Sequence, residues 1–216
     1  GMQAHRQNPR AGAQNALANM SIRVILADDH AVVRAGLRRL IDASPDIHVL
    51  AEAESGEQAF REYLAQRPDM AILDLNMPGM GGLEALRRIL AHDAAARILV
   101  LSMHEDIVYP ARALQSGACG YVTKRCAPEA LLDAIRVVAR GEIFLEPRIA
   151  QQLAMRGVTG KEEPLMELTA REFEVFRLLA AGQSVNEIAA VLFLSAKTVG
   201  TYQTHILKKL TANNLS

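Results

Sequence analysis

Five short apolar segments alternate with amphipathic segments between residues 22 and 140, and this alternation constrains the fold more than any other feature. The apolar segments have the length of buried strands, and the segments between them repeat apolar residues at helical spacing. Strands that alternate with helices form parallel sheets covered on both faces. The sequence therefore predicts an α/β fold class with a five-stranded, doubly wound parallel sheet. We expect strands at residues 22–27, 47–53, 69–74, 97–102 and 120–124, and helices at 31–43, 55–66, 83–92, 107–116 and 128–140.

The segments outside this alternation are of two kinds. Residues 142–166 contain scattered Pro and Gly and a Lys-Glu-Glu run, with one expected helix near 147–155, and we interpret them as a linker. Residues 1–20 are polar and lack the apolar middle of a signal peptide, which predicts a disordered tail. Gly1 before Met2 suggests a residue left by cloning, and Met20 is then the expected natural start.

Only helical patterns follow the linker, so we expect a second, all-α domain at residues 167–216. Thr169 and Ser184 each stand three residues before a glutamate, which is the spacing of a capping box. Ser195 suits the N-cap of a third helix. Within the first domain, Ser55 has the same capping-box spacing with a glutamine.

Composition excludes several classes of protein. Half of the residues are hydrophobic and 22% are charged, so wholesale disorder is excluded. Basic and acidic side chains balance at 24 each, so any affinity for nucleic acid must come from a local patch. No apolar run has the length of a membrane span, and we expect no membrane partner. Cys119 and Cys126 are expected to be free thiols in a reducing cytoplasm.

Polar side chains stand at four strand ends of the predicted sheet. Asp28 and Asp29 follow the first strand, Asp74 ends the third, Ser102 ends the fourth and Lys124 follows the fifth. Ligands bind at the carboxyl ends of parallel strands, so we expect these groups at one edge. Each has a structural alternative, since an aspartate there often only caps a turn or a helix. Together, acids, hydroxyl and amine at one edge favour a functional site.

The residue types at this edge suit phosphoryl chemistry. Clustered carboxylates repel one another, and a hard divalent cation such as Mg²⁺ (or Mn²⁺) removes that cost. An aspartate can accept a phosphoryl group as an acyl phosphate, while a hydroxyl and a lysine bind its oxygens. A Mg²⁺-dependent phosphatase is the enzymatic alternative. Enzymes that resemble the haloacid dehalogenase group use D-x-D at one strand end, which "LDLN" lacks.

The segments "VILADDHAVVRAGL", "AILDLNMPGMGG", "VLSMHED" and "GACGYVTKRCAPEAL" resemble the receiver domain of bacterial two-component response regulators. The opening "DDH…R.GL" is similar to the NarL/FixJ subfamily. The resemblance implies a receiver at residues 21–141 that is no enzyme beyond promoting its own Mg²⁺-dependent phosphorylation and dephosphorylation. It implies these roles: Asp74 as phosphoacceptor and metal ligand, Asp29 and the main-chain carbonyl of Asn76 as metal ligands, Asp28 acting on the metal through water, Ser102 as switch hydroxyl, Tyr121 as the aromatic that changes rotamer, and Lys124 as phosphate partner.

The last predicted helix has one apolar stripe and one polar face. The stripe is formed by Val199, Tyr202, Ile206 and Leu210. A helix with small polar and basic outward residues suits the major groove of DNA, although periodicity alone favours a protein-interaction domain about equally. From residue 168 onward there are five basic and three acidic side chains, a modest positive charge, so a single copy should bind DNA weakly.

The patterns "LT.RE.EV", "EIA", "LFLS..TV" and "IL.KL" resemble the LuxR-type helix-turn-helix, with Ser195–Leu210 as recognition helix. Val185-Asn186, Gly200 and Tyr202 depart from residues common in that family. The sequence stops at Ser216, before the family's dimerisation helix, which predicts either a truncated domain or an impaired dimer of DNA-binding domains. The implied DNA-contacting residues are Lys197, Thr198, Gly200, Thr201, Thr204 and Lys208.

The two resemblances together imply a bacterial, cytoplasmic transcription factor. A sensor histidine kinase would phosphorylate Asp74, and phosphorylation would control dimerisation and binding to double-stranded promoter DNA, with RNA polymerase as a further partner. The alternative of another class is a regulator whose helical domain binds a protein and not DNA. Salt-dependent binding to a duplex distinguishes the two.

Overall fold

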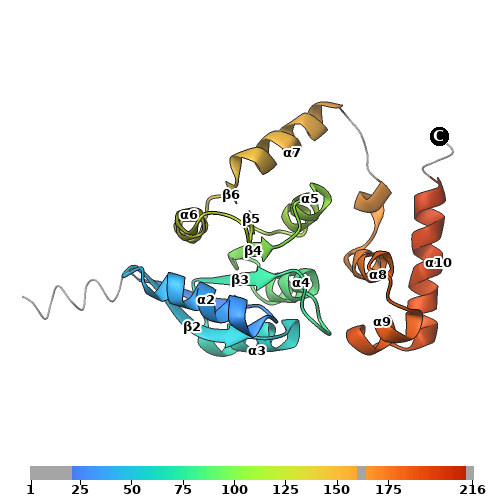
Figure 1. Cartoon of the computed structure of the whole chain (residues 1–216), viewed down its shortest axis with the longest axis horizontal. Helices are drawn as coiled ribbons and strands as arrows, with labels where there is room; N and C mark the ends of the chain where they lie inside the picture. Colours follow the sequence, from blue (N-terminus) through green and yellow to red (C-terminus); the bar gives the residue numbers. More distant parts are fainter. Residues whose placement is uncertain (1–20, 160–163, 213–216) are drawn as a thin grey trace, which may run out of the picture.

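A six-stranded parallel sheet with helices on both faces forms the larger part of the computed structural model (Figure 1). The structure describes residues 21–159 and 164–212, so the expected tail at 1–20 and the chain end at Ser216 lie outside the described residues. The strand order is β2-β1-β3-β4-β5-β6. The strands are β1 (Ile22–Ala27), β2 (Ile47–Ala53), β3 (Met70–Asp74), β4 (Ile98–Ser102), β5 (Gly120–Thr123) and β6 (Phe144–Leu145).

The five expected strands are confirmed to within one residue, but the expected number of strands is wrong by one. The short strand β6 pairs in parallel with β5, inside the segment that we interpreted as linker. Two residues are too few for a hydrophobic period, which is why the sequence did not show this strand. Glu146 directly after β6 accepts hydrogen bonds from the main-chain N–H (2.7 Å) and hydroxyl (3.1 Å) of Thr123. The start of the expected linker is therefore part of the sheet.

Alternating strand residues build two hydrophobic layers. Val24 and Leu26 of β1 pack with α2 and α6 on one face, while Ile25 and Ala27 pack with α3, α4 and α5 on the other. The helices are α2 (Ala31–Asp42), α3 (Gly56–Gln66), α4 (Gly82–His92), α5 (Val108–Gln115) and α6 (Pro128–Ala139). The Ser55 hydroxyl caps α3, but the expected reciprocal bond goes to the neighbouring residue, because the Gln58 side chain accepts from Glu54 N–H.

Helix α7 (Pro147–Thr159) and a short 3₁₀ helix, η1 (Pro164–Glu167), lead to the second lobe. This lobe consists of α8 (Ala170–Ala180), α9 (Val185–Leu192) and α10 (Ala196–Ala212). The capping boxes of Thr169 and Ser184 are confirmed, and Ser195 caps α10 by accepting from Thr198 N–H. No helix within 21–159 or 164–212 is long and apolar enough to span a membrane.

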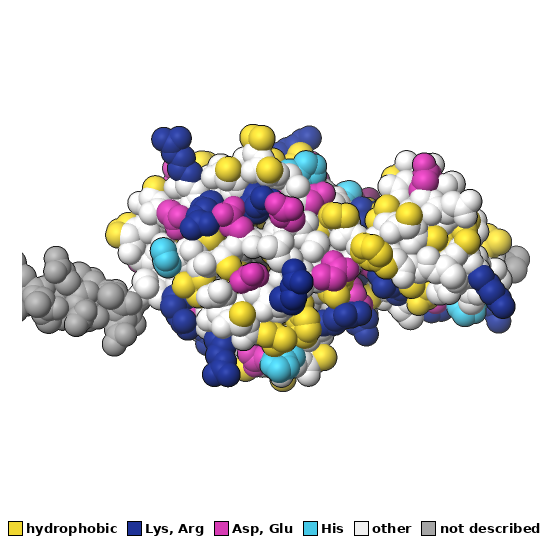
Figure 2. Space-filling view, turned by 90° about the horizontal axis from the view of Figure 1, so that it is seen from below, with side chains coloured by type: hydrophobic (Ala, Val, Ile, Leu, Met, Phe, Trp, Pro, Cys, Tyr) yellow, Lys and Arg dark blue, Asp and Glu magenta, His cyan; other side chains and the backbone are white. Residues whose placement is uncertain are grey.

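The two lobes share a continuous hydrophobic core, and α8 lies between the sheet domain and α10 (Figure 1). Residues of α8 contact α4, and η1 contacts α5, while α10 packs on α8, α9 and η1. Figure 2 shows acidic and basic side chains interleaved over one face of the larger lobe, with few charges over the middle of the smaller lobe. Helix α10, which is predicted to read DNA, lies on the side of the smaller lobe that faces away from the sheet (Figure 1).

Candidate phosphorylation site and DNA-binding helix

Three aspartates meet at the carboxyl edge of the sheet. Asp28, Asp29, His30 and Asp74 each offer one possible ligand atom, and these atoms lie within 4.8 Å of one another. The carboxylates of Asp28 and Asp74 are buried, with exposures of 1% and 2%, whereas Asp29 is partly exposed. The predicted acidic site is thus assembled by the fold. His30, to which the sequence analysis gave no role, lies in the same group.

Local turns aim the two buried carboxylates. Asp28 Oδ1 accepts from His30 N–H (2.8 Å), and Asp74 Oδ1 accepts from Asn76 N–H (3.2 Å). Both are turns in which an aspartate bonds to the main chain two residues ahead. The structural alternative from the sequence, an aspartate that caps a turn, is therefore also true of Asp74. It leaves the second oxygen of each carboxylate to face the site.

Lys124 bridges the two buried acids. Its Nζ lies 2.6 Å from Asp28 Oδ2 and 2.9 Å from Asp74 Oδ2. Burial disfavours the ammonium, but the hydrogen bonds and charges of both aspartates outweigh it and raise the pKa of Lys124. Burial also raises the pKa of Asp74, an effect that Lys124 only partly offsets. Buried charges of this kind persist only when paired, so these three residues form one electrostatic unit.

The predicted switch residues converge on the loop after β4. Ser102 is fully buried, and its hydroxyl accepts from His104 N–H (3.1 Å). Tyr121 is also fully buried, and its hydroxyl donates to the main-chain oxygen of His104 (2.6 Å). The His104 ring lies 2.8 Å from Asn76 Nδ2 and stacks on Tyr109 with ring centroids 3.9 Å apart. His104 therefore links the hydroxyl, the aromatic residue and the loop after Asp74, although no sequence pattern singled it out.

The donor atoms at this edge fit a hard divalent cation. Three carboxylates close together, two of them buried, supply the oxygen ligands that Mg²⁺ prefers, and this ion usually completes its shell with water and phosphate oxygens. Lys124 neutralises part of the negative charge of this cluster.

The outer face of α10 carries most of the predicted DNA contacts. Lys197, Thr201, Thr204 and Lys208 are exposed, whereas Val199 and Ile206 are buried against the lobe. Thr198 and Gly200 are only half-exposed, and Thr198 also takes part in the cap of α10, with its hydroxyl 2.8 Å from that of Ser195. Lys209 is not outward-facing, because it pairs with Glu172 of α8 at 2.8 Å.

The contact between the lobes is centred on Arg112 of α5, whose side chain is buried. Its Nη1 donates to the main-chain oxygens of Leu165 (3.2 Å) and Met166 (3.3 Å), and its guanidinium lies 4.8 Å above the Phe173 ring. Tyr109 meets the same ring edge-on, with centroids 5.4 Å apart. This set, which we call the Arg112 contact, joins the loop of His104 to α8.

The other side of the interface combines a buried acid with an aromatic contact. Glu174 of α8 is buried against Gly81 and pairs with Arg171 at 2.9 Å. Burial raises the pKa of Glu174, an effect that Arg171 only partly offsets. The Phe193 ring after α9 lies against Gly79 of the β3–α4 loop. The loop that follows Asp74 thus contacts both α8 and the α9–α10 turn.

Comparisons with known proteins agree with this architecture. Residues 24–136 match the response regulator receiver domain, and residues 166–216 match the bacterial regulatory proteins of the luxR family. The chain is 39% identical over 191 residues to the response regulator UvrY of Escherichia coli, covering 88% of each chain. It is 36% identical over 191 residues to the response regulator GacA of Pseudomonas aeruginosa, covering 88% of this chain and 89% of that protein.

Among solved structures, the match to RcsB from Salmonella enterica serovar Typhimurium, bound to the promoter rprA in the presence of phosphomimetic BeF3-, has a TM-score of 0.68. The sequences are 27% identical, and the match covers 88% of this chain and 93% of RcsB. A LuxR-family response regulator from Aurantimonas is 43% identical, covering 64% of this chain and 99% of that one with a TM-score of 0.62. The chain belongs to the NarL/FixJ family of two-component response regulators, proteins that bind DNA through a LuxR-type domain to regulate transcription.

Proposed function

We propose that Asp74 is the phosphoacceptor and that its phosphorylation by a sensor histidine kinase controls DNA binding by α10. The observation that carries the proposal is the bridge of Lys124 between Asp28 and Asp74. A buried lysine held by two buried acids at a strand end has no structural need to be there, and it can pair with a phosphoryl oxygen after transfer. We retain residues 21–141 as receiver and 167–216 as DNA-binding domain, with β6 as an added strand of the receiver sheet.

The transfer forms one bond and breaks one. An oxygen of Asp74 attacks phosphorus while the bond from phosphorus to the donor breaks, and the product is an acyl phosphate on Asp74. The electron pair of the broken bond leaves with the donor, which is the histidine of the kinase in signalling and acetate when acetyl phosphate is used. Asp28, Asp29, the Asp74 carboxylate and the main-chain carbonyl of Asn76 would hold Mg²⁺ or Mn²⁺. When bound, this ion neutralises charge on the phosphoryl oxygens. Lys124 then leaves Asp74 for one phosphoryl oxygen, and the charge lost from the carboxylate is replaced by that of the phosphate.

The switch acts through the loop of His104. In the structure the Ser102 hydroxyl accepts from His104 N–H, so a phosphoryl oxygen that accepts from this hydroxyl and draws it towards Asp74 would also pull on the residue that donates to it. Tyr121 holds that loop from the other side, through the main-chain oxygen of His104. Movement of the loop displaces Tyr109, which contacts Phe173 of α8. Phosphorylation therefore acts on the contact between the lobes.

The test of the proposal is the intact mass of the full chain after incubation with acetyl phosphate and Mg²⁺. We expect a gain of one phosphoryl group in the wild type, and no gain in Asp74→Asn or with a chelator present. A gain that persists in Asp74→Asn would place the phosphoryl group on another residue. No gain in the folded wild type would contradict a phosphoacceptor at this site.

For DNA binding we propose contacts from Lys197, Thr198, Gly200, Thr201, Thr204 and Lys208. The LuxR-type match and the structures of RcsB with promoter DNA support this interface, and a structure of RcsB dimers on DNA supports a homodimer. The dependence of this dimer on phosphorylation is part of our proposal. Recruitment of RNA polymerase by the DNA-bound dimer is part of the same proposal.

Lys208→Ala tests the interface with a matched control. Each protomer loses one phosphate contact, so we expect weaker binding to a promoter duplex and a salt dependence lower by about one counterion per protomer. Arg140→Ala removes an equal charge from the end of α6, where Arg140 pairs with Glu142, and should leave the salt dependence unchanged. Equal effects of the two variants would mean that only net charge matters.

A further inference from the structure

Arg34 lies in the first turn of α2, close to the acidic site, and the function described so far does not use it. Its guanidinium is largely buried, with 11% of the side chain exposed. We propose that Arg34 is a positioning residue: it fixes the main chain at Asp28 and thereby sets the affinity of the acidic site for a divalent cation. This inference rests on the proposed cation site and concerns a residue outside it.

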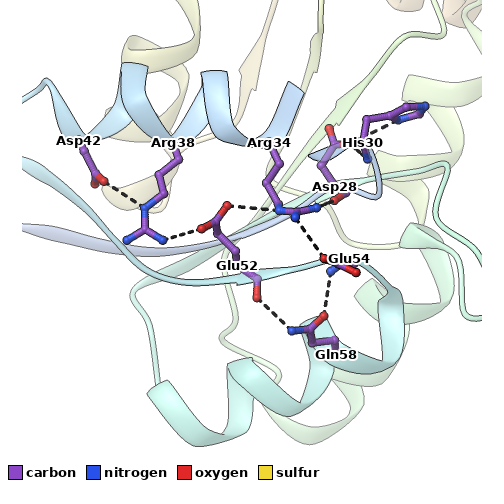
Figure 3. Close-up of polar contacts among 8 residues, drawn as sticks. All are labelled: Asp28, His30, Arg34, Arg38, Asp42, Glu52, Glu54 and Gln58. Atoms are coloured by element: carbon purple, nitrogen blue, oxygen red, sulfur yellow. Dashed lines mark hydrogen bonds and ion pairs between the residues drawn. The ribbon is translucent and has the colours of Figure 1, made fainter. Parts of the chain in front are cut away.

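The three hydrogen bonds of Arg34 go in three directions (Figure 3). Nη1 donates to the main-chain oxygen of Asp28 at 2.6 Å, the shortest of the three. Nε and Nη2 donate to the carboxylates of Glu52 and Glu54, each at 3.2 Å. Both glutamates belong to or directly follow β2, so the side chain ties the end of β1 to its neighbouring strand.

The peptide groups at Asp28 are thereby held from both sides by β2. Asp28 N–H donates to the main-chain oxygen of Ala53 at 3.0 Å, and its carbonyl accepts from Arg34, which Glu52 and Glu54 hold in place. The carbonyl of Asp28 belongs to the peptide that joins it to Asp29. The orientation of this peptide decides where both carboxylates point, so Arg34 acts on two proposed ligands at once.

The geometry requires a guanidinium. Its N–H groups diverge in one plane and can serve three separate acceptors, whereas the single ammonium of a lysine cannot occupy three such positions. The Gln58 side chain completes the arrangement by binding Glu52 O (3.4 Å) and Glu54 N–H (3.0 Å), which fixes the strand that carries the two glutamates.

Arg38, one turn further along α2, provides a matched control. It pairs with the same Glu52 at 2.6 Å and with Asp42 at 3.3 Å, but its hydrogen bonds do not extend to Asp28. Figure 3 shows the Glu52 carboxylate between the two arginines. Arg38→Ala therefore removes the same charge and an ion pair with the same glutamate, without loss of the bond to the Asp28 carbonyl.

The sign of the effect separates positioning from charge. Loss of a positive charge near an acidic cluster strengthens the binding of a cation by Coulomb's law. If Arg34 acted only as a charge, Arg34→Ala would bind Mg²⁺ as tightly as the wild type or more tightly. If it holds the ligands in place, the variant binds Mg²⁺ more weakly, by roughly 10- to 100-fold, as is typical when a residue that orients metal ligands is removed.

The experiment is a calorimetric titration of MgCl₂ into the full chain at constant ionic strength, with no phosphoryl donor. We expect at least about tenfold weaker binding for Arg34→Ala and unchanged or tighter binding for Arg38→Ala. In phosphorylation by acetyl phosphate, the Mg²⁺ concentration for half-maximal rate should rise by the same factor, with the rate at saturating Mg²⁺ unchanged. If Arg34→Ala were only partly folded, the amount of phosphorylated protein would fall instead, without a change in the Mg²⁺ concentration for half-maximal rate.

Two outcomes overturn the inference alone: Arg34→Ala binds Mg²⁺ like the wild type, or both variants weaken binding equally. Wild-type protein that fails to bind Mg²⁺ overturns the proposed cation site as well, so the two failures are distinguishable. If Arg34→Ala does not fold by circular dichroism, Arg34→Lys replaces it. That variant keeps the positive charge but loses the planar guanidinium with its diverging N–H groups, and its Mg²⁺ affinity is compared with that of Arg38→Ala in the same way.

Discussion

One hydrogen bond joins Tyr121 to the loop after β4. Its ring is fully buried in the core between β5 and α5, and its hydroxyl donates to the main-chain oxygen of His104. Burial raises the pKa of Tyr121, so the hydroxyl keeps its proton and its role as a donor. Removal of the whole side chain would leave a large cavity, at a cost of about 3–5 kcal/mol, and would confuse signalling with unfolding.

Tyr121→Phe isolates the hydroxyl. We expect the free energy of unfolding to fall by about 1 kcal/mol, because the His104 carbonyl loses its donor while the ring stays in place. Phosphorylation of Asp74, measured by intact mass, should remain. The difference in DNA affinity between phosphorylated and unphosphorylated protein, measured by fluorescence anisotropy, should shrink. An unchanged difference would mean that the switch does not pass through this hydroxyl.

At the residue scale the sequence predicts contacts that strand register determines, and it fails where contacts depend on loops. Asp28, Asp74 and Lys124 were predicted to meet because the ends of parallel strands share an edge. His104 and Arg34 were not predicted as parts of the site. His104 acts through a loop conformation, and Arg34 acts through a main-chain carbonyl, an acceptor that every residue has. Both lie in segments that carry the family resemblance, "DDH…R.GL" and "VLSMHED", but residue types alone do not show which contacts they make.

The loop between β3 and α4 depends on glycines that approach other main chains. A Cβ atom at Gly82 would collide with the main-chain oxygen of Asp74, and one at Gly56 with that of Met80. Gly82 N–H also donates to the oxygen of Leu75 at 3.2 Å. The loop therefore folds back on the strand end that carries the proposed phosphoacceptor.

Gly82→Ala and Gly36→Ala should have opposite effects on stability. At Gly82 the new methyl group meets the main chain of Asp74, so we expect destabilisation of about 1–3 kcal/mol and slower phosphorylation. Gly36 lies within α2 with open space around its missing Cβ, and alanine there should stabilise the protein by about 0.5–1 kcal/mol. Thermal unfolding of both variants is the measurement. Destabilisation by both would contradict the close approach as the cause.

At the element scale, caps and periods predicted the helices well. The boxes at Thr169 and Ser184 rely on local bonds between residues three apart, and both form as expected. At Ser55 the same spacing gives only one of the two bonds of a capping box. The Gln58 side chain does not bond to Ser55 N–H, because it bonds to Glu54 N–H and to the main-chain oxygen of Glu52 in β2. Strand β6 depends on pairing with β5, which is a long-range contact and invisible to local patterns.

The arrangement of the two lobes, at the scale of the whole molecule, could not be predicted at all. It depends on Arg112, which is buried although its spacing in α5 does not distinguish it from other arginines, and on Glu174, a buried acid in a helix of ordinary composition. Two surfaces must recognise each other for these residues to become buried. The contact leaves α10 outward, but the β3–α4 loop lies against Phe193, which follows α9. In this arrangement the loop that follows Asp74 lies against the turn between α9 and α10.

Arg112→Ala tests whether this contact restrains the DNA-binding domain. The variant loses two charge-assisted hydrogen bonds to η1, each worth about 1.5–3 kcal/mol, and a cation–π contact with Phe173. We expect the associated form to become at least about tenfold less populated, which small-angle scattering reports as a larger radius of gyration. The unphosphorylated variant should then bind promoter DNA more tightly than the unphosphorylated wild type, with a smaller gain on phosphorylation.

Arg87→Ala supplies the control for that experiment, because Arg87 is exposed on α4 and its ion pair with Glu84 lies on the receiver alone. It should change neither the radius of gyration nor the affinity for DNA. If Arg112→Ala increases the radius without tightening DNA binding, the contact organises the lobes but does not restrain α10, and phosphorylation must then act through dimerisation. If neither quantity changes, the remaining contacts of Glu174 and Phe193 hold the lobes together by themselves, because loss of one interfacial residue is tolerated only where the others suffice.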